Sequence, residues 1–137
     1  MKYLLLIFLA VANFCAYAQN PNWKNTVAWK IYDMGDIHGL AFSLDTLKGF
    51  PSGRLEDDSM HRYLRFANTL PKDKYPLWNG EYIATYKKGG KSYKMDFSVY
   101  GGFFRDEYSN TLFIIPEPQA SSLYSYLIRK LKLIHRK

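Results

Sequence analysis

The chain has 137 residues, of which 47% are hydrophobic and 23% charged, with a formal net charge of +7 and one cysteine. This length fits a single globular domain, because domains of about 100 residues are common. One cysteine also excludes a disulfide framework, so the domain must be held together by its hydrophobic core.

Residues 1–18 have the parts of a secretory signal peptide. Lys2 supplies a charged start, residues 3–12 form an apolar run, and an Ala-Tyr-Ala sequence ends the segment. The apolar run is too short to span a bilayer comfortably, so an uncleaved membrane anchor is the weaker interpretation. Cleavage before Gln19 predicts that residues 19–137 form one compact α+β domain without a transmembrane span. We expect that domain to be exported, to a bacterial periplasm or to the exterior.

Cys15 lies inside the predicted signal peptide. Such a position can indicate a lipoprotein, whose signal resembles Leu-Ala-Gly-Cys, but here the bulky Phe14 precedes the cysteine. Cleavage without lipidation is therefore favoured, and the mature chain would be free of cysteine.

The first predicted strand follows a polar lead-in. Residues 19–25 are polar and are expected to form a loose segment. Residues 27–34 alternate, which places Val27, Trp29 and Ile31 on one side. Alternation with a period of two indicates a half-buried β-strand.

Residues 30–39 then contain a Gly-Asp-Ile-His-Gly sequence at the end of that strand. It resembles the first metal-binding motif of the calcineurin-like metallophosphoesterases, especially their serine/threonine phosphatase branch. The resemblance implies that Asp36 and His38 bind catalytic metals, which would activate water for phosphoester hydrolysis. The family's later Gly-Asp-x-x-Asp-Arg and Gly-Asn-His motifs are missing, and the chain is too short for that fold. A polar turn is favoured, with a phosphohydrolase, or a single metal held by Asp33, Asp36 and His38, as the alternative.

A short segment, a loop and a helix are predicted next. Residues 42–47 fit either a short helix capped by Ser43 or an extended segment, and residues 50–54 predict a loop. A helix over 58–70 is predicted, with Asp57, Asp58 or Ser59 as N-cap and Pro71 at its end. Its apolar stripe consists of Met60, Tyr63, Leu64, Ala67 and Leu70.

The strongest prediction is a hairpin over residues 81–100 with a Gly89-Gly90 turn. A two-residue loop pairs Lys88 with Lys91, Tyr86 with Tyr93, Ala84 with Met95 and Tyr82 with Phe97. One face is then apolar and the other mainly polar, with Ile83 as the exception. A one-residue slip would mix the two faces, so the register is well specified.

Further strands are expected on both sides of this hairpin. Residues 75–78 precede an Asn-Gly turn and fit a short strand. The Gly101-Gly102 pair predicts a bend, residues 106–110 a polar turn, and residues 111–115 a buried strand. The chain thus predicts an antiparallel β-meander of three to five strands.

Residues 121–137 predict a basic amphipathic helix. Leu123, Leu127, Leu131 and Ile134 line one face, and Tyr124 and Ile128 widen it. A helix of this kind can lie on an anionic membrane surface. Packing of the apolar stripe on the sheet is favoured, because the apolar face of the meander needs a cover.

The positive charge is concentrated late in the chain. Residues 19–86 carry eight basic and eight acidic side chains, whereas residues 87–137 carry ten basic and four acidic ones. The candidate partner-binding residues are therefore Lys87, Lys88, Lys91 and Lys94 at the hairpin tip, and Arg129, Lys130 and Lys132 near the end of the chain. An acidic protein or another anionic surface would suit them, and a merely solubilising surface is the alternative. Nucleic acid is not expected, because the chain has an export signal and no recognisable binding module.

These patterns predict an α+β fold in which one face of the meander is covered by the 58–70 and 121–137 helices. No nucleophile motif, phosphate-binding glycine loop or other catalytic set is visible, and no cofactor is expected. The resulting hypothesis is a small exported, non-catalytic binding protein, with an immunity or inhibitor protein as one concrete form. The metal-dependent phosphohydrolase and the membrane-surface protein are the alternatives.

Overall fold

The computed structural model describes Trp23, Asp73 and residues 25–35, 43–71, 82–98 and 102–136. The elements occur in the order β1 (Val27–Tyr32), α2 (Leu44–Leu47), β2 (Ser52–Arg54), α3 (Asp57–Leu64), β3 (Asn68–Thr69), β4 (Tyr82–Lys88), β5 (Lys91–Phe97), β6 (Phe103–Asp106), β7 (Thr111–Ile114) and α4 (Gln119–His135). The predicted signal peptide, the candidate ligands Asp36 and His38, and the predicted strand at residues 75–78 lie outside the described residues.

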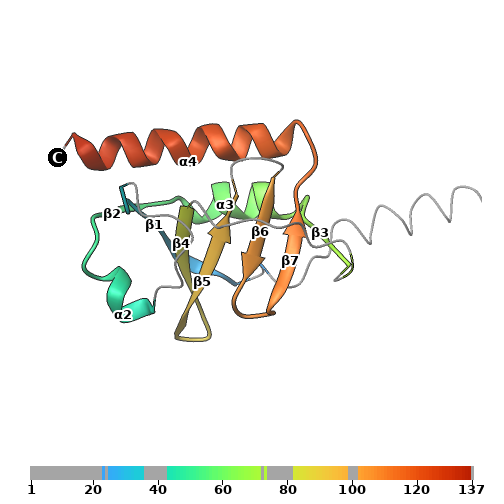
Figure 1. Ribbon diagram of the computed structural model, residues 1–137, viewed down its shortest axis with the longest axis horizontal. Helices are drawn as coiled ribbons and strands as arrows, with labels where there is room; N and C mark the ends of the chain where they lie inside the picture. The colour runs from blue at the N-terminus through green and yellow to red at the C-terminus, as the bar shows by residue number, and fades with distance from the viewer. Residues whose placement is uncertain are drawn as a thin grey trace, which may run out of the picture.

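The described strands form one antiparallel sheet in the order β2-β1-β4-β5-β6-β7-β3. Strands β4 to β7 are consecutive neighbours, so the α+β class and the meander are confirmed. The sheet has seven described strands and is wider than the three to five expected. Figure 1 shows α4 running across the ends of the central strands, with α3 behind them.

The β4–β5 hairpin has the predicted register, from Lys88 opposite Lys91 to Tyr82 opposite Phe97. Gly89 and Gly90 both take positive φ, of 58° and 78°, which is the conformation that a tight two-residue hairpin turn requires. Ile83, the exception on the polar face, is buried in a second cluster with Met34 and with Leu47 of α2. The side chain that broke the alternation is therefore covered by the short helix.

The main core lies between one face of the sheet and the helices α3 and α4, as predicted. Trp29 stacks on Tyr86 with 4.6 Å between ring centroids. Phe104 stacks on Phe113 at 5.1 Å. Trp23 is only 3% exposed and packs edge-on against the same rings, at 5.5 Å from Phe104 and 5.3 Å from Phe113. The expectation of a loose lead-in is thus wrong at Trp23, because its indole packs in the aromatic core.

Residues 52–54 form strand β2 and not part of a loop, which corrects the prediction for residues 50–54. Gly53 lies opposite Ile31 of β1. Three residues are too few to show the alternation that predicts a strand. Here pairing with β1 determines the strand conformation, which the local sequence does not.

Helix α3 ends at Leu64, well before the predicted end at residue 70. Asn68 and Thr69 instead pair with β7 as strand β3, so sheet pairing overrides the helical spacing of Ala67 and Leu70. The N-cap is Glu56, one residue before the predicted candidates, and it makes no capping side-chain hydrogen bond.

The start of β1 also differs from the prediction. Val27 is 48% exposed although Trp29 and Ile31 are fully buried. The register shifts between Val27 and Lys30, and Ala28 has a φ of 55°. A bulge at this point turns Val27 out of the core face.

The other predicted elements are present with small changes of boundary. Ser43 caps α2 by accepting a hydrogen bond from the Thr46 N–H at 3.2 Å, so the helical alternative for this segment is confirmed. The turn after β6 is organised by the buried Asp106, which accepts hydrogen bonds from the Tyr86 hydroxyl at 2.5 Å and the Ser109 hydroxyl at 2.8 Å. Burial and this hydrogen bond raise the pKa of Tyr86, so its hydroxyl stays protonated.

Candidate functional site

A hollow of about 400 Å³ opens between β2 and the C-terminal half of α4, and we call it the β2–α4 groove. Both elements lie at the left of Figure 1. Two apolar side chains of α4 line the groove together with charged and small residues of β2, of α4 and of two helix caps. The lining residues are Ser52, Gly53, Arg54, Glu56, Lys130, Leu133, Ile134 and Arg136. A volume of this size lies within the usual range of binding pockets.

Gly53 allows α4 to approach the backbone of β2. A Cβ atom at this position would lie 3.1 Å from Cγ1 and 3.2 Å from Cδ1 of Ile134. Successive side chains of a strand point to opposite faces. Because the Gly53 position faces α4, the side chains of Ser52 and Arg54 point toward the opposite face of the sheet.

Glu56 connects α3 to α4 at one end of the groove. The Tyr126 hydroxyl accepts a hydrogen bond from the Glu56 N–H at 2.8 Å and donates one to the Glu56 carboxylate. Lys130 Nζ lies 2.5 Å from Glu56 Oε1. The hydrogen bond from Lys130, followed by that from Tyr126, lowers the pKa of Glu56 to about 2. Burial and the bond to Glu56 raise the pKa of Tyr126 to about 12. Near neutral pH, Lys130 therefore balances the carboxylate of the groove.

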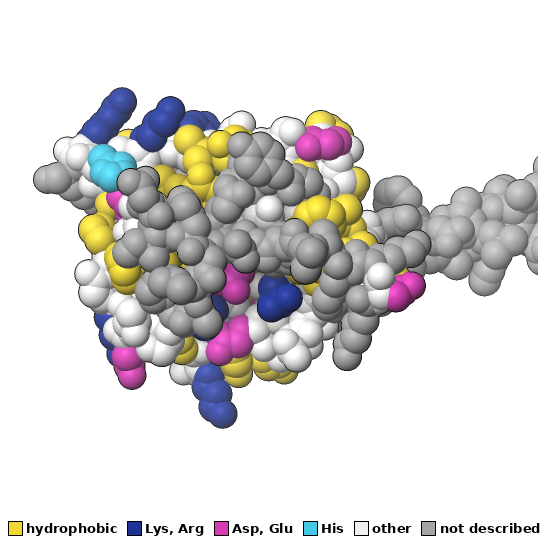
Figure 2. Space-filling view, viewed as in Figure 1, with side chains coloured by type: hydrophobic (Ala, Val, Ile, Leu, Met, Phe, Trp, Pro, Cys, Tyr) yellow, Lys and Arg dark blue, Asp and Glu magenta, His cyan; other side chains and the backbone are white. Residues whose placement is uncertain are grey.

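Two arginines border the groove, Arg136 at the end of α4 and Arg54 of β2, whose side chain lies on the opposite face of the sheet. Neither Arg54 nor Arg136 forms an ion pair within the described part of the chain. Lys30 lies directly opposite Arg54 in the β1–β2 pair. Like charges at directly opposed positions destabilise a sheet. Figure 2 shows further Lys and Arg side chains gathered along the C-terminal half of α4. An anionic partner would relieve this repulsion.

The basic residues predicted to bind a partner form two separate groups. Lys87, Lys88, Lys91 and Lys94 lie on the β4–β5 hairpin, whose tip is at the end of the sheet opposite α4 in Figure 1. There the Lys88 ammonium lies 4.3 Å from the centroid of the Tyr108 ring, in cation–π contact. Arg129, Lys130 and Lys132 lie on α4, where Lys130 lines the groove and the other two are exposed.

No metal-binding group of three or more His, Cys, Asp or Glu side chains occurs among the described residues. Asp33 is the one described member of the candidate ligand set. Its Oδ1 accepts a hydrogen bond from the Gly35 N–H at 3.0 Å, and its Oδ2 lies 2.7 Å from His135 Nε2. Asp33 thus joins the end of β1 to the end of α4. Elemental metal analysis of the mature protein and of Asp36→Asn and His38→Asn variants would test the metal hypothesis.

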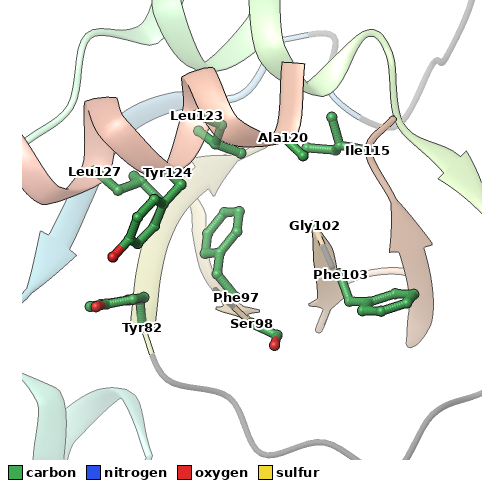
Figure 3. Close-up of a pocket in the computed structure, with 10 residues that line it drawn as sticks. All are labelled: Tyr82, Phe97, Ser98, Gly102, Phe103, Ile115, Ala120, Leu123, Tyr124 and Leu127. Carbon is green, nitrogen blue, oxygen red and sulfur yellow. The ribbon is translucent and has the colours of Figure 1, made fainter. Parts of the chain in front are cut away.

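The N-terminal half of α4 covers a second, much smaller hollow (Figure 3). Its volume is about 20 Å³, which is room for about one water molecule. A Cβ atom on Gly102 would lie 2.8 Å from the Cβ of Ala120, so β6 and α4 are in close contact here. Figure 3 shows Phe97 and Leu123 filling the space between sheet and helix. This site leaves no space for a ligand of ordinary size.

No protein-family model, curated protein or solved structure matches the chain. None of the described helices is both long and apolar enough to cross a membrane. The geometry and charge of the β2–α4 groove are therefore the basis for a functional proposal.

Lys130 is predictable as a site residue from the sequence, whereas Arg54, Glu56 and Tyr126 are not. Arg54 stands in a segment predicted to be a loop, and a carboxylate just before a helix, as Glu56 is, predicts a cap or a solvated turn. Tyr126 lies beside the apolar stripe of α4, next to Leu127, and is buried. The available signal was the Ser-Gly-Arg sequence, where one glycine in a strand can mark the close approach of another backbone.

Proposed function

We propose that the protein is a small exported, non-catalytic binding protein that recognises a partner protein through the β2–α4 groove, as an immunity or inhibitor protein does. The observation that carries this proposal is the Arg54 charge, which lies opposite Lys30 and has no ion pair in the described structure. Such a pair opposes folding, and residues that serve binding often reduce stability. The signal-peptide sequence of residues 1–18 supports export.

The groove offers two kinds of contact to a partner. Leu133 is 50% exposed and Ile134 lines the wall, so an apolar side chain could be buried there. Arg136 beside the groove and Arg54 on the other face of β2 supply positive charge, which attracts an acidic partner and speeds the encounter. An apolar contact flanked by charge is the usual composition of a protein interface.

The test begins with a tagged form of residues 19–137. This protein captures partners from the exported protein fraction of the organism that encodes it, and calorimetry then measures binding of each purified partner. Two double variants with the same change in charge are compared. The groove variant combines Arg54→Glu and Arg136→Glu, and the tip variant combines Lys87→Glu and Lys91→Glu. We expect the groove variant to lose at least about tenfold in affinity and the tip variant to bind like the wild type.

The two variants separate the possible surfaces. Equal weakening of both would indicate charge attraction without a defined site, and weakening of the tip variant alone would move the site to the hairpin. Capture of no partner that binds in purified form would count against a binding function.

Association with an anionic membrane surface is a second candidate. Arg129, Lys132 and Leu133 are all exposed on α4, at the spacing of one helical face. This face can lie on lipid while the opposite face stays packed on the sheet. Co-sedimentation with phosphatidylglycerol vesicles tests it, with phosphatidylcholine vesicles as the control. Unchanged binding after deletion of residues 129–137 would refute it.

A further inference from the structure

The outer edge of β2 has backbone groups directed away from the sheet. The Asp33 N–H donates to the Pro51 carbonyl, and the Leu55 N–H to the Trp29 carbonyl, both at 2.9 Å. In an antiparallel ladder, hydrogen-bonded and non-bonded pairs alternate. Gly53 and Ile31 are therefore a hydrogen-bonded pair, whereas the N–H and C=O groups of Ser52 and Arg54 point outward. No described group forms a hydrogen bond with them.

The two edges of the described sheet differ in charge. Strand β3 has two uncharged residues, with Pro71 soon after them, and β2 has three residues and directly follows Pro51. A short strand next to a proline discourages further pairing at either edge. The β2 edge also carries the positive charge of Arg54, with Lys30 opposite it on β1. These charges repel the same edge of a second copy of the chain and attract an acidic strand.

We propose that the β2–α4 groove binds an extended acidic segment of the partner protein, which pairs with the outer edge of β2 as an additional strand. This inference rests on the proposed binding function and specifies the chemistry of the partner. Backbone hydrogen bonds to an exposed edge supply affinity in such complexes, and alternate side chains supply specificity.

The geometry of β2 also specifies the sequence pattern of the segment. A residue opposite Arg54 lies on the same face as the arginine and should be acidic. A residue opposite Gly53 points toward α4, where Leu133 and Ile134 form an apolar wall. The bound segment therefore alternates acidic and apolar residues with a period of two.

A synthetic octapeptide of alternating valine and glutamate, blocked at both ends, is the probe. The matched control has the same composition with all glutamates in one half. Two further peptides carry N-methyl groups on one or the other alternate set of backbone amides. We expect the alternating peptide to bind in fluorescence anisotropy and the control to bind at least about tenfold more weakly. One N-methylated series should bind and the other should not, because only alternate amides face β2.

Hydrogen exchange measured by NMR locates the contact. The amides of Ser52 and Arg54 should exchange quickly in the free protein and become protected when the peptide binds. The Gly53 amide, already bonded to Ile31, should change little. The Arg54→Glu, Arg136→Glu variant should lose peptide binding, and the Lys87→Glu, Lys91→Glu variant should keep it.

Three results would overturn the inference. The first is that the alternating peptide does not bind, and the second is that both N-methylated peptides bind. The third is that the Ser52 and Arg54 amides are protected from exchange without peptide, in a chain that sediments as a dimer. The proposed function can survive such a failure. A captured partner could depend on Arg54 and Arg136 and yet leave the Ser52 and Arg54 amides unprotected. In that case the groove binds a partner by charge and not by strand addition.

Discussion

The two halves of α4 differ in burial, although the same amphipathic sequence pattern continues through both. In the first half Leu123, Tyr126 and Leu127 are buried, and the hollow beneath them holds about 20 Å³. In the second half Leu133 is 50% exposed, and a groove of about 400 Å³ opens beside the helix. The first half lies over strands with large aromatic side chains, whereas the second half lies over β2, where Gly53 has no side chain.

This difference separates the half of α4 that packs on the sheet from the half that is proposed to bind a partner. Buried apolar contacts of the first half hold α4 on the sheet, so the second half can expose charge without loss of the fold. Substitutions in the two halves should therefore affect different measurements.

Leu127→Ala should lower the free energy of unfolding by about 2–5 kcal/mol, because it removes a buried side chain and leaves a cavity. Leu133→Ala is the matched control on the exposed half and should change the free energy of unfolding by no more than about 0.5 kcal/mol. Urea denaturation measures both variants. Similar losses for both would show that the two halves contribute equally to the fold.

Tyr126→Phe should destabilise by about 1–3 kcal/mol, because the Glu56 N–H loses its partly buried hydrogen-bond partner. Thermal and urea denaturation at neutral pH measure this effect. Tyr124→Phe, at an exposed position of the same helix, serves as the control and should be close to neutral. A neutral Tyr126→Phe would mean that water replaces the hydroxyl without loss.

Gly53→Val should destabilise by an amount near the lower end of about 1–3 kcal/mol, because the new side chain meets Ile134. The loss of stability stays small, because the end of the Ile134 side chain can move. Combining it with Ile134→Ala should recover part of the stability that the two single variants lose. Additive losses in the double variant would place the strain elsewhere.

The Glu56 carboxylate should make stability depend on acid pH. Its pKa in the folded protein is about 2, below its ordinary value of 4.5. Its contribution is therefore complete above pH 4.5 and is lost as the pH falls from 4.5 toward 2. The side chain is 54% exposed, so screening limits the effect to about 1 kcal/mol or less. In urea titrations over this range, the difference between wild type and Glu56→Gln should shrink with acidity. A constant difference would contradict the prediction.

Arg54→Glu should slightly stabilise the free protein, by about 0.2–1 kcal/mol, since it converts a like-charge pair with Lys30 into an opposite-charge pair. The same variant, combined with Arg136→Glu, is expected to lose partner binding. The gain should disappear in a Lys30→Gln background and at high salt. A loss of stability would show that the Arg54 charge supports the fold.

The sequence predicted those parts of the fold whose information is local. The Gly89-Gly90 turn and the alternation around it determine the hairpin register, and the apolar stripe identifies α4. Strand β2 could not be predicted, because its three residues become a strand only by pairing with β1. The same limit applies to β3, which pairs with residues far along the chain.

The candidate site was harder to predict because it is formed by distant contacts. Glu56 meets Tyr126 and Lys130 across 70 and 74 positions of the chain. No local sequence pattern predicts which residues come into contact when they are so far apart along the chain. Lys130 was found through its charge alone, and its pairing with Glu56 required the fold.

The strand order also affects how the chain can fold. The early strands β1 and β2 contact α4, the element farthest along the described chain. Trp29 and Ile31 therefore lack this cover until α4 has been synthesised. Contacts over such long separations slow folding, because a large loop must close before they form. The chain should complete its core only once α4 is available to pack, and truncation before α4 should leave the early strands prone to aggregation.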